Sequence, residues 1–178
     1  MIFGVVVSIF LVVVIKQGII VVPEGYEYSL ERFGKFLRVL KPGLHIVVPF
    51  FDMVGAKLNM KEQMWDFPVV EALTKDENIL HIKGALRFQI QDSAKAAYQV
   101  RDLTQALSKL IETNIRSQLS KMSKDDFLSQ QDAVCYKLRD ILDAATVSWG
   151  IKVIQIKIWD EAMQSADPFE RPADYYTK

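Results

Sequence analysis

The chain has little of the chemistry on which most metal-binding and reactive sites depend. Among its 178 residues there are one cysteine, Cys135, and two histidines, His45 and His81. A single cysteine excludes an internal disulfide and a cysteine-rich zinc site. Neither histidine has a second histidine at a metal-ligand spacing, so we expect no bound metal and no cofactor.

Sequence patterns of the common enzyme classes are also missing. There is no glycine-rich phosphate-binding loop, because Gly25, Gly34 and Gly43 lie too far apart. There is no Gly-x-Ser-x-Gly motif around a nucleophilic serine. We therefore expect no catalytic residue and no small-molecule substrate. An enzyme stays a disfavoured alternative, since the members of a catalytic triad converge only in the fold.

An excess of charge of one sign is likewise absent. Twenty-two basic residues balance twenty-two acidic ones, without a long block of either sign. This balance does not indicate a general affinity for nucleic acid. Without its apolar start the chain has about 155 residues, enough for one good core or two small domains.

What the chain does have is an uncharged opening. Residues 2–15 carry no charge; Lys16 and Gln17 follow, and then a stretch that is apolar apart from Gly18 and ends at Val22. A helix through residue 15 would be about 22 Å long, and one through Val22 about 33 Å. The hydrocarbon core of a bilayer is about 30 Å thick. We predict a membrane anchor over residues 1–17, formed by Ile2, Phe3, Val5, Val6, Val7, Ile9, Phe10, Leu11, Val12, Val13, Val14 and Ile15.

Two other interpretations of this opening stay open. A signal peptide fits less well, because no basic residue precedes the run and no small-residue cleavage pattern follows it. A buried strand is the other alternative, since short apolar runs are ambiguous. For a single-pass anchor, the basic residues that follow it place the body on the cytoplasmic or matrix-like side of a bacterial or organelle inner membrane. These residues are Lys16, Arg32, Lys35, Arg38 and Lys41.

The body changes its hydrophobic period part-way along. Strands are expected at residues 19–22, 26–30, 44–48, 56–65, 69–73 and, most clearly, 80–91, where apolar and polar residues alternate. Helical spacing follows at 93–100, 103–119 and 133–148, with a short segment after Ser123, and a strand at 151–159 closes the domain. Asp92, Asp102 and Ser123 are expected to cap helices. Strands followed by helices predict an α+β fold.

This change of period predicts four parts. They are the anchor at 1–17, a β-rich half at 18–92, an α+β half at 93–160 and a poorly ordered tail at 161–178, which contains Pro168 and Pro172.

A proline followed by two aromatic residues suggests a second membrane contact. Pro49, Phe50 and Phe51 lie in a loop about 30 residues after the anchor, where the rings can enter the interfacial layer. The alternative is that both rings belong to the core at a strand end, as buried phenylalanines commonly do. Both interpretations stay open.

Several short strings together resemble the stomatin/prohibitin/flotillin (SPFH, or Band 7) family, and its bacterial stomatin-like members most closely. The strings occur in the family's order across about residues 18–160: Val22-Pro-Glu-Gly25, Glu31-Arg-Phe-Gly-Lys35, Lys41-Pro-Gly-Leu-His45, Val48-Pro-Phe-Phe-Asp52, Lys61-Glu-Gln63, Thr74-Lys-Asp76, Phe88-Gln-Ile-Gln-Asp92, Ala97-Tyr98 and Trp149-Gly-Ile151.

The resemblance implies a two-part Band 7 domain in a membrane scaffold that assembles into rings or cages and organises lipids or membrane proteins. It implies no catalytic residues. Family members usually continue into an Ala/Glu-rich coiled coil, which does not follow Asp160 here, and the anchor lacks the proline that bends the hairpin of animal stomatins. We therefore expect a straight span. Two functions stay open: a scaffold that oligomerises laterally, and an accessory structural subunit of a larger membrane complex.

Overall fold

The computed structural model describes residues 18–163. The predicted anchor at 1–17, and the predicted tail beyond residue 163, lie outside the described residues. Contacts divide the described chain into two compact units, which we treat separately. Unit 1 comprises residues 18–62, 89–101 and 148–151, and unit 2 comprises residues 63–88, 102–147 and 152–163. The sequence-based boundary at residue 92 does not coincide with this division, because each unit is built from separate segments of the chain.

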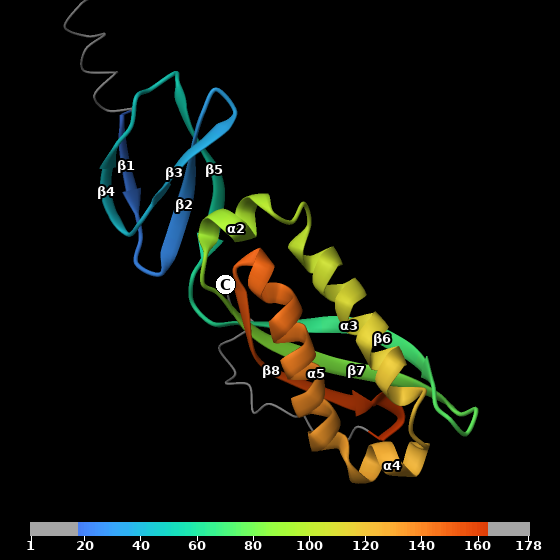
Figure 1. The fold of residues 1–178 in the computed structure, drawn as a ribbon. Helices are drawn as coiled ribbons and strands as arrows, with labels where there is room; N and C mark the ends of the chain where they lie inside the picture. The colour runs from blue at the N-terminus through green and yellow to red at the C-terminus, as the bar shows by residue number, and fades with distance from the viewer. Residues whose placement is uncertain (1–17, 164–178) are drawn as a thin grey trace, which may run out of the picture. The chain divides into compact units, whose positions relative to one another are not determined.

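Unit 1 contains two small antiparallel arrangements of strands (Figure 1). The strands β1 (Ile19–Val22) and β4 (Gly43–Ile46) form a pair, and Ile19 lies opposite Ile46. The second sheet has the order β3-β2-β5, with β2 at Tyr26–Arg32, β3 at Lys35–Leu40 and β5 at Asp52–Asn59. The short helix α2 (Ser93–Tyr98) contacts β2. One small cluster of buried apolar residues in unit 1 consists of Val22, Leu30, Leu40 and Val47.

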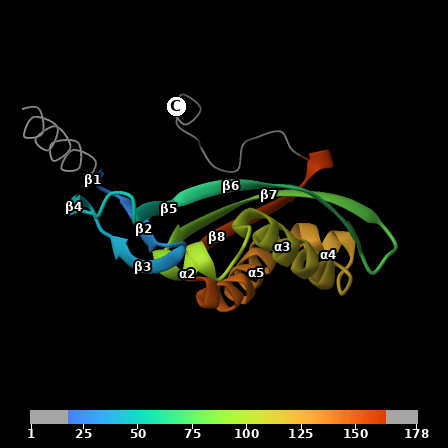
Figure 2. The same cartoon turned by 90° about the horizontal axis from the view of Figure 1, so that it is seen from above.

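Unit 2 is a sheet with helices on one face (Figure 2). Its strands β6 (Gln63–Leu73), β7 (Ile79–Ile90) and β8 (Ile151–Asp160) have the order β6-β7-β8. The helices are α3 (Leu103–Leu119), α4 (Lys124–Ser129) and α5 (Gln131–Thr146), and short 3₁₀ helices occupy Val147–Trp149 and Glu161–Met163. The last of these shows that the predicted tail begins with ordered structure.

Period-two and helical spacing are confirmed in unit 2. The predicted apolar face of β7 is buried throughout, whereas His81 on the other face is exposed. The α3 stripe is equally buried at Leu107, Ile111, Ile115 and Leu119. Helix starts were predicted correctly as well: Asp92 and Asp102 accept hydrogen bonds from the backbone N–H groups of Lys95 and Gln105, and Ser123 forms a capping box with Asp126.

Several strand and helix boundaries were predicted wrongly. The expected strand at 56–65 is interrupted near Met60, because the Asn59 side chain accepts from the Lys61 backbone N–H and the Met60 N–H donates to Gly25. The next strand starts at Gln63 and passes through Pro68, which an edge strand tolerates at an irregularity of its ladder. The expected strand at 44–48 ends at Ile46. The expected helices at 93–100 and 133–148 are observed at 93–98 and 131–146.

Candidate functional site

The loop that carries Pro49, Phe50 and Phe51 is a tight turn held by one carboxylate. The backbone N–H groups of Phe51 and Asp52 donate to the carbonyl of Val48, at 3.3 and 2.9 Å. The Asp52 side chain closes the turn by accepting from the Val48 backbone N–H at 2.8 Å. The same carboxylate accepts from Nε and Nη2 of Arg32, at 2.6 and 3.1 Å. Asp52 therefore ties the β4–β5 turn to the end of β2.

This geometry acts on the ionisation of Asp52. The hydrogen bonds from the Arg32 guanidinium, followed by the bond from the Val48 N–H, hold the pKa of the Asp52 carboxyl below its usual range. The carboxyl is thus ionised at neutral pH, and the charge-assisted pair with Arg32 fixes the conformation of the turn.

The aromatic side chains of this turn point to solvent. Phe50 is 75 % exposed and Phe51 49 % exposed, so the core alternative does not describe either ring. Pro49 is half-buried. Phe33, in the β2–β3 turn, is 77 % exposed and meets the Phe51 ring edge-on at a centroid separation of 5.4 Å. The Phe33 N–H also donates to the Phe51 carbonyl. Two turns thus present their phenylalanines together.

The backbone at the two most exposed rings is unusual for phenylalanine. Phe33 has φ of 52° and Phe50 has φ of 74°, in the left-handed region. This region costs about 1–2 kcal/mol for a residue with a Cβ atom. Such outliers occur where the surrounding structure determines the conformation, and they cluster at functional positions.

Exposed aliphatic side chains continue this surface along β1 and β4. Alternation places one set of residues toward the core, while the opposite face of the pair is open to solvent. We define the apolar surface of unit 1 as nine exposed residues of this face, of the two turns and of the start of β5: Ile19, Val21, Phe33, Leu44, Ile46, Val48, Phe50, Phe51 and Met53. Clustered exposed apolar groups of this kind mark interaction sites.

Comparison with known proteins identifies the domain that carries this surface. A family model described as SPFH domain / Band 7 family matches residues 20–161, which is most of the chain.

The chain belongs to the SPFH domain / Band 7 family.

Curated relatives agree with this assignment. Human "Stomatin-like protein 2, mitochondrial" is 33 % identical over 142 residues, which cover 80 % of this chain and 40 % of the relative. An uncharacterised protein of Methanothermobacter thermautotrophicus is 33 % identical over 155 residues, covering 86 % of this chain and 48 % of the relative. One from Methanocaldococcus jannaschii is 28 % identical over 156 residues, covering 88 % and 78 %. The chain thus spans less than half the length of the first two relatives.

The reactive side chains of this SPFH domain have structural partners. The His45 Nε2 atom lies 2.6 Å from the Lys41 carbonyl, and His81 lies 3.8 Å from the Glu71 carboxylate at the surface. Cys135 is half-buried on α5, and this burial raises the pKa of its thiol, which lowers its reactivity at neutral pH. Within residues 18–163 no three His, Cys, Asp or Glu side chains form a group suited to a metal ion.

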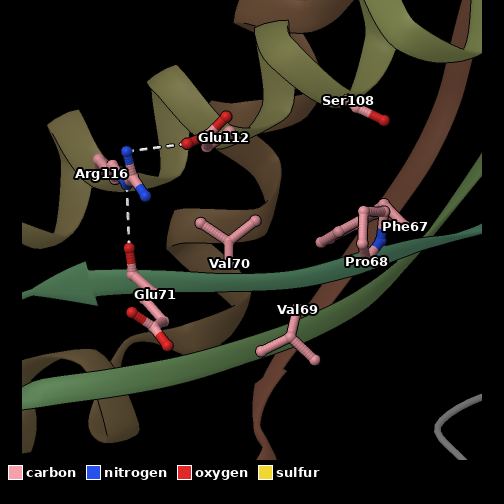
Figure 3. Close-up of a pocket in the computed structure, with 8 residues that line it drawn as sticks. All are labelled: Phe67, Pro68, Val69, Val70, Glu71, Ser108, Glu112 and Arg116. Carbon is pink, nitrogen blue, oxygen red and sulfur yellow. Dashed lines mark hydrogen bonds and ion pairs between the residues drawn. The ribbon is translucent and has the colours of Figure 1, made fainter.

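The SPFH domain also has an open cleft in unit 2 between β6 and α3 (Figure 3). Its volume is about 270 Å³, and Pro68 and Val69 contribute apolar walls. The Arg116 guanidinium spans the cleft, because its Nε donates to the Glu71 carbonyl at 2.9 Å and its Nη1 pairs with Glu112 at 2.8 Å. Through these contacts Arg116 covers the exposed edge of β6. The residues that line the cleft include no histidine or cysteine.

Sequence reasoning selected only part of the apolar surface. Of its nine residues only Phe50 and Phe51 were named, together with the neighbouring Pro49; the other seven, Phe33 and Met53 among them, were not assigned to it. Phe33 follows Arg32 in an ordinary turn signal, and only the fold brings its ring against Phe51. None of the helices at 18–163 has both the length and the apolar character needed to cross a membrane. The predicted anchor residues from Ile2 to Ile15 lie outside the part of the chain that the structure describes.

Proposed function

We propose that this protein is a non-catalytic, membrane-associated scaffold whose unit 1 lies against the lipid surface through its apolar surface. The single observation that supports this proposal is the grouping of exposed Phe33, Phe50 and Phe51 on one end of a small β unit. Apolar side chains that enter the interfacial layer bind a membrane in proportion to the apolar area they bury. Membership of the SPFH family supports a membrane-associated role without catalytic chemistry.

Chain geometry favours lipid over a soluble protein as the occupant of this surface. The strand β1 starts at Ile19, which pairs with Ile46, and the Gly18 carbonyl accepts from the Val47 N–H at 2.8 Å. The four residue steps from Ile15 to Ile19 span at most about 14 Å. A membrane that holds residues 2–15 therefore lies within a short distance of the Ile46 end of β4, from which the Phe50 turn follows directly.

The anchor part of the proposal is tested by deletion. After a high-salt wash, a much smaller fraction of a chain that lacks residues 2–17 should stay in the membrane pellet than of the full chain, because only the apolar surface of unit 1 then holds it. If the shortened chain resists the same wash completely, the anchor is not what holds the protein at the membrane. Protease added to the opposite face of sealed vesicles should leave the body intact, as the proposed single-pass orientation requires.

The contribution of the apolar surface is tested in the same shortened chain. Replacing Phe50 and Phe51 together by Ser should lower co-flotation with neutral phosphatidylcholine vesicles at least several-fold, since rings in the interfacial layer are partly buried and each contributes a part of the free energy of full burial, about 1.5–3 kcal/mol. A matched control replaces two exposed apolar residues of unit 2, Leu73 and Ile79, by Ser. Equal losses in both double variants would show that the Phe50 turn has no special role. Circular dichroism and urea midpoints should be unchanged in both variants.

Lateral self-association is the second part of the proposed scaffold. It rests on the family resemblance, and its test is the size of the detergent-solubilised full chain by native mass spectrometry. A series of multiples of this chain alone supports a scaffold that oligomerises. A single copy bound to other membrane proteins of the host instead supports an accessory structural subunit.

A further inference from the structure

The aromatic end of unit 1 also carries an imbalance of charge. The β2–β3 turn and the β4–β5 turn lie at the same end of the unit in Figure 1, next to the start of β1. Three basic residues belong to this end, namely Arg32, Lys35 and Arg38, against two acidic ones, Glu31 and Asp52. Which ligand this end of unit 1 can bind depends on which of these charged side chains already have partners.

Both acidic side chains are already engaged. The Asp52 side chain is only 2 % exposed, and its carboxylate accepts hydrogen bonds from Arg32 and from the Val48 N–H. Glu31 accepts a hydrogen bond from the Tyr98 hydroxyl of α2 at 2.7 Å. Arg32 and Asp52 neutralise each other, and the Tyr98 hydroxyl holds the Glu31 carboxylate, which keeps its negative charge. The exposed cations that remain at the phenylalanine end are Lys35 and Arg38.

Arg38 is the better placed of these two cations. Its Nη2 lies 3.5 Å from the carbonyl of Ile46, so the guanidinium reaches the end of β4 immediately before the Phe50 turn. The positive charge of Arg38 also helps, less than Arg32 and the Val48 N–H, to hold the pKa of Asp52 below its usual range. Within residues 18–163 no ion pair to Arg38 or Lys35 is observed, and both side chains are exposed. Most of the five guanidinium N–H donors thus face solvent.

We propose that Arg38, assisted by Lys35, binds the phosphate of anionic phospholipid headgroups where the phenylalanines of unit 1 meet the membrane. This proposal rests on the proposed membrane contact of the same surface and adds a lipid preference to it. Guanidinium groups bind phosphate oxygens in a bidentate way. With the phenylalanine rings of unit 1 in the interfacial layer, the Arg38 guanidinium would lie at the depth of the lipid headgroups.

The magnitude of the preference follows from charge near an anionic surface. A basic residue close to such a surface contributes about 1 kcal/mol, which is about a five-fold difference in affinity. An anionic lipid should therefore bind at least about five-fold more tightly than a zwitterionic one with the same acyl chains. Because the interaction is between exposed charges, added salt should reduce the preference.

The test uses the full chain in neutral-detergent micelles. Short-chain phosphatidylglycerol or phosphatidylcholine is titrated in, and bound lipid is counted by native mass spectrometry. The wild-type chain should prefer phosphatidylglycerol, and Arg38→Gln should reduce that preference about five-fold. Arg38→Lys, which keeps the charge but loses the bidentate donors, should retain only part of it. Glycerol phosphate at equal concentration should not displace the lipid, because it lacks the chains that contact the rings.

Lys41 supplies a matched control within the same unit. It is exposed and carries the same charge, but it follows β3 at the end opposite the phenylalanine turns. Lys41→Gln should leave the preference unchanged. Equal binding of both lipids by the wild-type chain, absent phosphatidylglycerol binding, or an equal effect of Lys41→Gln and Arg38→Gln each overturns the headgroup proposal. Failure of the proposed membrane association is seen separately, as loss of flotation of the full chain with neutral vesicles.

Discussion

Units 1 and 2 differ in how much of their apolar side chains they bury. Unit 2 buries its apolar residues between a sheet and a layer of helices, so that Ile111, Leu138 and Leu142 have no measurable exposure. Unit 1 has a cluster of four buried apolar residues, whereas the nine residues of its apolar surface are exposed. The difference indicates that unit 2 supplies stability, whereas unit 1 uses part of its hydrophobicity for contact with something outside the domain.

The strongest test of this contrast is a cavity in unit 2. Ile111→Ala should lower the free energy of unfolding by about 2–5 kcal/mol, because the side chain is fully buried against the sheet. Urea unfolding followed by circular dichroism measures the change. Ile111→Val, the milder control, should cost about 0.5–1.5 kcal/mol. Lipid binding at low denaturant should stay unchanged, and a parallel loss of lipid binding would contradict the division of roles.

A second variant tests how closely the sheet of unit 2 is packed. A Cβ atom at Gly84 would lie 2.3 Å from the Lys157 carbonyl oxygen and 2.4 Å from the Phe67 ring. Gly84→Ala should therefore destabilise the protein by about 1–3 kcal/mol, since a strand or a buried ring has to move. The thermal midpoint reports this cost. An unchanged midpoint would mean that the strands of unit 2 shift more easily than the structure indicates.

A smaller effect is expected at a helix start. Ser123→Ala removes the hydroxyl that accepts from the Asp126 backbone N–H, and it should cost about 1 kcal/mol. The control Ser123→Thr keeps a hydroxyl that can accept from the Asp126 N–H and donate to the Asp126 carboxylate, and it should be close to wild type. Because α4 belongs to unit 2, neither change should affect co-flotation with vesicles; a measurable effect would mean that unit 2 takes part in membrane contact.

The smallest effect concerns the Asp52 carboxylate in unit 1. Its pKa is lowered in the folded chain, so the stability it contributes is present above its unfolded pKa, about 4, and is lost as pH falls through the lower folded value. Asp52→Asn should reduce the slope of stability against pH in that acidic range and speed amide exchange at Val48. Identical acid titrations of the two proteins would contradict the role of Asp52 in holding the turn.

How much of the fold could be predicted from the sequence depends on how regularly each helix or strand is buried. β7 and α3 were predicted because one face of each is buried along its length, which leaves a period of two or of 3.6 in the sequence. β3 was missed because four consecutive residues from Lys35 are exposed, so no alternation marks it. The break near Met60 was missed because a local contact of the Asn59 side chain creates it.

The candidate site shows the same limit. Two phenylalanines after a proline were visible in the sequence, but their exposure depends on a turn closed by Arg32 and Asp52, which are 20 residues apart. Phe33 could not be assigned to the site without the fold, because its neighbour Phe51 belongs to a different turn. The strand at β1 was predicted from its β-branched residues, but all four are apolar, so which of its faces is covered depends on the pairing with β4.

The left-handed backbone of Phe33 and Phe50 implies that thermal stability and membrane binding make opposite demands on these two positions. Asn or Gly at either position would relieve the backbone penalty and should raise the melting temperature, while removing the ring that the membrane meets. A screen for thermostable variants alone would therefore be expected to erode these two turns first, and its most heat-resistant products should be the ones least able to stay on lipid.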